Sequence, residues 1–65
     1  MDTQEEKENA LLLALCQEAG SEGTREELIQ GARANHYPED VTNAANGDVA
    51  SLVQLRRDFG LPVFV

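Results

Sequence analysis

Cysteine, histidine and tryptophan are scarce in this chain of 65 residues, which contains one cysteine, one histidine and no tryptophan. The single cysteine, Cys16, cannot form a disulfide within the chain, and its place in an apolar run is typical of a buried thiol in a reducing compartment. Cys16 and His36 lack the clustered spacing of zinc ligands. We therefore expect no metal and no other cofactor.

Long hydrophobic runs are also missing. The apolar run at residues 10–16 is far shorter than the roughly 20 residues that cross a bilayer. It follows an acidic N-terminus, whereas signal peptides begin with basic residues. The sequence therefore predicts a cytoplasmic protein with no membrane partner.

Basic residues are few, since five of them stand against twelve acidic ones and the formal net charge is −7. This balance opposes long-range attraction to nucleic acids and to anionic membranes. Two interpretations stay open: a solvated acidic surface, or a surface that binds a basic protein partner.

No set of residues with catalytic spacing is present. Nucleophilic catalysis needs a nucleophile, a base and an orienting group together. The one histidine, His36, stands beside Tyr37 and Pro38 at a helix junction, where a capping or packing role is expected. The carboxylates fall in the first turns of helices and near the N-terminus, and the glycines form no phosphate-binding motif. We expect no catalytic residue and no enzymatic activity.

Apolar periodicity and capping signals predict a single, mostly α domain over residues 1–65, with residues 1–4 disordered. We expect a first helix over residues 5–19 that ends at Gly20. Its apolar face contains Leu11, Leu12, Leu15 and Ala19.

A second helix is predicted to begin at Thr24, because Thr24 and Glu27 have the spacing of a capping box. It ends near Asn35, since Pro38 disfavours helical geometry at the residue before it. Gly31 either weakens this helix or permits close packing. The expected buried stripe is Leu28, Ile29 and Ala32.

Two shorter helices are predicted beyond Pro38. The third spans residues 38–45, with Val41 and Ala44 or Ala45 as its apolar contacts. The fourth begins after Asp48 as its cap, runs to about Phe59 and stops at Gly60. Its expected buried face contains Val49, Leu52, Val53 and Phe59, with Leu55 off the centre of that face.

Residues 61–65 are apolar and β-prone, and they predict a short C-terminal β-strand with no obvious pairing partner in the chain. Leu13 points away from the apolar face of the first helix. It is either half-covered by another part of the chain or part of a dimer surface. The predicted partner-binding residues are Leu13, Val63, Phe64 and Val65.

Three segments together resemble a winged-helix form of the helix-turn-helix. Residues 9–19 resemble the opening helix of such domains, residues 23–28 the entry into their second helix, and residues 49–63 their recognition helix running into the first wing strand. The resemblance implies DNA binding through the last helix, with Ser51, Gln54 and Arg57 facing outward. Two departures exist: residues 35–48 are much longer than the usual turn, and the chain ends where the wing's return strand should begin.

Arg56 and Arg57 form the one local basic cluster. The pair either interacts with the negative end of the fourth helix or contacts a phosphate or an acidic partner. On a helix, adjacent residues point about 100° apart, so the two do not form one dense patch. The nucleic-acid-binding residues of this interpretation are Ser51, Gln54, Arg56 and Arg57.

Two functions follow from these observations. The first is a small acidic protein-interaction module, a regulator, adaptor or inhibitor that also self-associates as a homodimer. The alternative is a DNA-binding helix-turn-helix transcription regulator that uses residues 49–59. The expected fold for both is a compact bundle of three to four helices, helix-turn-helix-like, with the short C-terminal strand.

Overall fold

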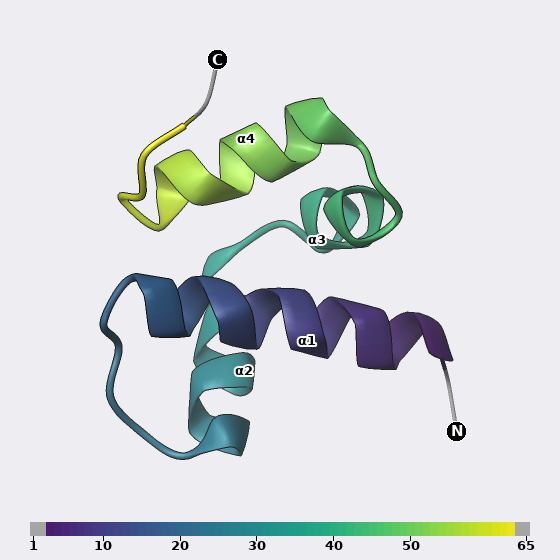
Figure 1. Cartoon of the computed structure of the whole chain (residues 1–65). Helices are drawn as coiled ribbons and strands as arrows, with labels where there is room; N and C mark the ends of the chain where they lie inside the picture. Colours follow the sequence, from purple (N-terminus) through teal and green to yellow (C-terminus); the bar gives the residue numbers. More distant parts are fainter. Residues whose placement is uncertain (1–2, 64–65) are drawn as a thin grey trace.

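The computed structural model describes residues 3–63, and within them the chain forms four α-helices (Figure 1). These are α1 (Thr3–Glu18), α2 (Arg25–Asn35), α3 (Pro38–Ala45) and α4 (Val49–Asp58). Helix α1 runs across the middle of the molecule and packs against α2 on one side and α3 on the other, and α3 packs in turn against α4. The prediction of a mostly helical bundle is confirmed.

The core forms where the apolar sides of the four helices meet. Leu12 and Leu55 are completely buried, and Val41 is nearly so. Leu15, Cys16, Ala32 and Ala44 complete the buried cluster. No helix within residues 3–63 is long and apolar enough to cross a membrane.

Helix α1 begins earlier than predicted, since Thr3 and Gln4 belong to it; residues 1 and 2 lie outside the described part. It ends as expected before Gly20, which has a φ of +77° that L-amino acids with side chains rarely adopt. The Ser21 amide donates to the Cys16 carbonyl across this turn at 2.9 Å. Of the predicted apolar face, Leu12 and Leu15 are buried and Leu11 packs against the core, but Ala19 is exposed.

The boundaries of α2 and α3 agree with the prediction. The Glu27 amide donates to the Thr24 hydroxyl, and the Thr24 amide donates to the Glu27 carboxylate, so the capping box is complete. Pro38 opens α3, and Val41 and Ala44 are its buried residues. In α2, Ile29 and Ala32 are buried and Leu28 packs against the core.

The predicted buried face of α4 is correct for Leu52 and Phe59, which pack against the core, and wrong for Val49 and for the placing of Leu55 off its centre. Leu55 is completely buried, whereas Val49 is 66% exposed. Ser51 and Arg56, both polar, lie on the buried side with Leu55. Asp48 does precede the helix, but within the described residues its carboxylate accepts from the Ser51 hydroxyl at 2.7 Å instead of capping a backbone amide.

The predicted C-terminal strand is also wrong for the part that the structure describes, since residues 61–63 form no strand. Gly60 adopts a φ of +75°, and the Leu61 amide then donates to the Arg56 carbonyl at 2.8 Å. This turn folds Leu61 back onto the core, and Pro62 has no amide to give to a neighbouring strand. Phe64 and Val65 lie outside the described residues.

Candidate functional site

Glu8 is a buried carboxylate that joins three helices. It accepts hydrogen bonds from Gln4 on its own helix, from Arg33 of α2 at 3.1 Å and from Thr42 of α3 at 3.0 Å. Arg33 also donates twice to Asn9. The hydrogen bond from Gln4, with those from Thr42 and Arg33, lowers the pKa of Glu8 against the opposing effect of burial. Both carboxylate oxygens are engaged, so the group holds the helices together.

Arg56 joins the end of α4 to the end of α1. Its two terminal nitrogens donate to the two oxygens of Glu18 at 3.0 and 2.5 Å, and its Nε donates to the Pro62 carbonyl at 2.8 Å. The hydrogen bonds from Arg56 lower the pKa of Glu18, and those to Glu18 raise the pKa of Arg56. The Arg56 side chain is 10% exposed. Its guanidinium is therefore engaged inside the protein.

The four residues predicted to contact nucleic acid do not share one surface. Ser51 is buried, so the expectation that it faces outward is wrong. Arg56 is buried and paired with Glu18. Gln54 and Arg57 are exposed, and Gln54 donates to Asp58 at 3.1 Å. The face of α4 that is open to solvent thus carries only part of the predicted set.

Two of the predicted partner-binding residues, Leu13 and Val63, lie within the described part of the chain. Leu13 is half-buried, which agrees with the alternative that the chain itself half-covers it. Val63 is half-buried as well, in the segment that follows the Gly60 turn. Phe64 and Val65 lie outside the described residues.

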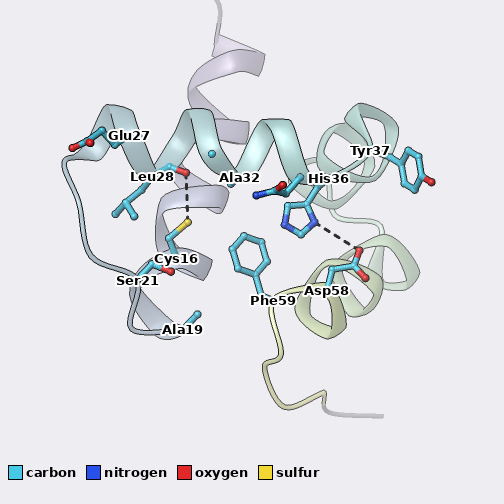
Figure 2. Close-up of a pocket in the computed structure, with 12 residues that line it drawn as sticks. Cys16, Ala19, Ser21, Glu27, Leu28, Ala32, His36, Tyr37, Asp58 and Phe59 are labelled. Carbon is cyan, nitrogen blue, oxygen red and sulfur yellow. Dashed lines mark hydrogen bonds and ion pairs between the residues drawn. The ribbon is translucent and has the colours of Figure 1, made fainter.

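An open groove of about 840 Å³ lies between the C-terminal end of α1, one side of α2 and the C-terminal end of α4. We call it the α2–α4 groove. Figure 2 shows Glu27 near one end of it and Asp58 near the other, with Cys16, Leu28 and Phe59 between them. Local sequence patterns do not predict this groove, because the helix ends that build it meet only in the folded chain.

His36 directly follows α2, lines this groove and lies against the end of α4. Its ring stacks on Phe59 with a centroid distance of 4.6 Å and an interplanar angle of 13°. The His36 side chain is 7% exposed, and its Nδ1 has no hydrogen-bond partner within residues 3–63. Asp58 Oδ2 lies 3.7 Å from this nitrogen, a contact that is too long for a hydrogen bond. The predicted packing role of His36 is confirmed.

Cys16, His36 and Asp58 all line the groove, and they are the residue types of a thiol nucleophile, a base and an orienting group. The local geometry disfavours that chemistry. The Cys16 thiol donates to the Leu28 carbonyl at 3.7 Å, and burial raises its pKa, so the reactive thiolate is disfavoured. No group of three or more His, Cys, Asp or Glu side chains in the described part of the chain converges as a metal site would require.

The chain matches no known protein family, no characterised protein and no solved structure.

Proposed function

We propose that this chain is a small, non-catalytic protein-interaction module that acts as a regulator, adaptor or inhibitor of a partner with a basic surface. The observation that carries the proposal is how the charges are distributed between the interior and the surface. Arg33 and Arg56 are two of the five basic residues, and both form ion pairs with carboxylates of the chain itself.

Most of the acidic residues in the described part face solvent, in contrast to these two arginines. Exposed carboxylates without a salt bridge inside residues 3–63 lie on α1, α2, α3 and the turns before α2 and α4: Glu5, Glu6, Glu22, Glu26, Glu27, Glu39 and Asp48. A surface of this kind attracts cationic partners over about one Debye length and repels phosphate backbones. It supports a basic protein partner over a nucleic acid.

Peptide arrays that vary net charge at constant apolar content test this proposal. We expect retention of the labelled chain to rise with the positive charge of the peptide and to fall as salt is added. Retention that is independent of peptide charge would remove the basis for a basic partner.

Self-association is the second part of the proposal. Val49 and Tyr37 are exposed apolar side chains at 66% and 76%, and Leu13 and Val63 are partly exposed. Small domains often gain stability by associating. Light scattering of the full chain and of a chain truncated after Pro62 tests self-association. This truncation keeps Pro62, whose carbonyl Arg56 binds. An unchanged oligomeric state would argue against a contact through residues 63–65.

DNA binding is a second candidate, and one observation favours it. Helix α3 fills most of the segment between α2 and α4, so only residues 46–48 connect α3 to α4. A connection of three residues is the length that a helix-turn-helix uses. In this candidate α3 and α4 form the motif, and Gln54 and Arg57 face the groove of the DNA. Salt-dependent binding to duplex DNA that is lost in Arg57→Ala would support it.

A further inference from the structure

The α2–α4 groove has both apolar and polar side chains along its walls and carboxylates at its two ends. Leu28 and Phe59 are partly buried residues that pack on the core and also line the groove. Glu27 and Asp58 stand on opposite sides of them, as Figure 2 shows. No lysine or arginine lines this groove in the described part of the chain. A ligand here therefore meets apolar surface flanked by negative charge.

Asp58 contributes a partly exposed carboxylate to the groove. Its Oδ1 accepts from Gln54, whereas its Oδ2 faces the His36 Nδ1 at 3.7 Å, beyond hydrogen-bonding distance. The Asp58 side chain is 38% exposed, so a cation from solvent can reach it. On the other side of this contact, the His36 Nδ1 is buried and has no hydrogen-bond partner within residues 3–63. Buried polar atoms without a hydrogen bond are uncommon in folded proteins.

Small residues along the groove leave room for a polypeptide to approach. A Cβ added at Gly31 would meet nothing within 4 Å, so Gly31 does not mark close packing between helices. Ala19, on the opposite wall, is exposed. The groove is open along its length and offers no enclosed cavity of the sort that surrounds a small molecule.

We propose that the α2–α4 groove binds a segment of a partner protein in which an arginine or lysine stands next to an apolar side chain. The cation binds Asp58 or Glu27, and the apolar side chain packs between Leu28 and Phe59. The proposal rests on the proposed function and assigns its partner a chemistry and a place. Charge complementarity favours this occupant over a second copy of the chain, whose net charge is −7.

The test is an NMR titration of the isotope-labelled full chain with two capped peptides, acetyl-Leu-Arg-Phe-Arg-Leu-amide and its counterpart with glutamate in place of arginine. We expect saturable shifts of backbone amide signals at Ala19, Gly31 and Asn35 with the arginine peptide only. In the double variant Asp58→Asn/Glu27→Gln the affinity should fall by about 1.5-fold to fivefold per removed contact, the range of exposed ion pairs. Glutamine at position 27 keeps the capping box, so the fold is preserved.

The matched control is Glu26→Gln/Glu39→Gln, which removes the same charge from exposed sites that do not line the groove. This control should bind as the unmodified chain does. Absence of shifts, equal shifts with the glutamate peptide, or equal losses in both double variants would overturn the proposal. Saturable shifts centred on Glu5 and Glu6 would also overturn it, while leaving the broader proposal of a basic partner intact.

Discussion

Arg56 and Glu18 face each other with two parallel hydrogen bonds, of 3.0 and 2.5 Å, across the ends of α4 and α1. This bidentate arrangement is the geometry in which arginine binds carboxylates best. The same guanidinium holds the Pro62 carbonyl, so one side chain fixes the chain reversal after Gly60. The neighbouring Arg57 is exposed. Two adjacent arginines thus have different roles.

Replacing Arg56 should destabilise the protein far more than replacing Arg57. Arg56→Ala leaves the Pro62 carbonyl and the Glu18 carboxylate without their donor, and it lowers the midpoint of urea unfolding. Arg57→Ala, the matched control, changes the free energy of unfolding by less than about 0.5 kcal/mol, as expected for an exposed site. Equal effects of the two substitutions would contradict the structural role of Arg56.

Stability should fall in acid, and Glu8 should account for part of this fall. The hydrogen bonds from Gln4, Thr42 and Arg33 hold the Glu8 pKa below its ordinary value of 4.5. A lowered folded-state pKa stabilises the protein above pH 4.5, and this contribution is lost as the pH falls through the lower, folded-state value. Glu18 and Glu27, whose pKa values are also lowered by Arg56 and by the Thr24 amide, contribute in the same direction.

Glu8→Gln isolates the contribution of Glu8. Chemical unfolding at several pH values should show a shallower dependence of stability on pH in this variant, and the exposed Glu6→Gln should behave as the unmodified chain. At neutral pH, Glu8→Ala should cost about 1–3 kcal/mol, because Arg33 and Thr42 lose a buried acceptor. An unchanged pH profile in Glu8→Gln would show that Glu8 does not couple to folding.

Much of this fold could be predicted because its helix boundaries are written in local sequence. The capping box at Thr24, the proline at position 38 and the glycines at positions 20 and 60 each act within one turn, so they mark two helix starts and two helix ends correctly. The buried face of α4 could not be predicted in this way. Its polar members, Ser51 and Arg56, are satisfied by partners, and the partner of Arg56 lies 38 positions earlier in the chain.

The candidate site, like the fold, depends partly on local sequence and partly on contacts between distant segments. The sequence predicts a partner surface made of apolar residues. The groove, in contrast, is formed by helix ends that meet only in the folded chain. His36 could be assigned to a helix junction, but its stacking on Phe59 depends on the position of α4, which local signals do not fix.

Leu55→Ala tests the corrected face of α4. Leu55 is completely buried in the core, so its truncation should cost about 2–5 kcal/mol and leave this small domain largely unfolded at ambient temperature. Val49→Ala, on the exposed side of the same helix, should leave the far-UV circular dichroism spectrum and the thermal midpoint nearly unchanged. The reverse order of effects would favour the face that the sequence predicted.

The Cys16 thiol should react slowly with a thiol reagent in the folded protein. It is 4% exposed, it donates to the Leu28 carbonyl, and burial raises its pKa. The modification rate measured with a chromogenic disulfide should therefore rise steeply when urea unfolds the chain. Rapid modification under native conditions would indicate that the core around α1 opens readily.

A comparison of two titrations, on one labelled sample of the full chain at low salt, decides between a basic protein partner and a nucleic acid. One uses the arginine peptide described above, and the other uses a short duplex DNA. The account predicts saturable amide shifts along the α2–α4 groove with the peptide and no saturable shifts with the DNA. Saturable binding of the DNA, with shifts centred on Gln54 and Arg57 and none in the groove with the peptide, would contradict it.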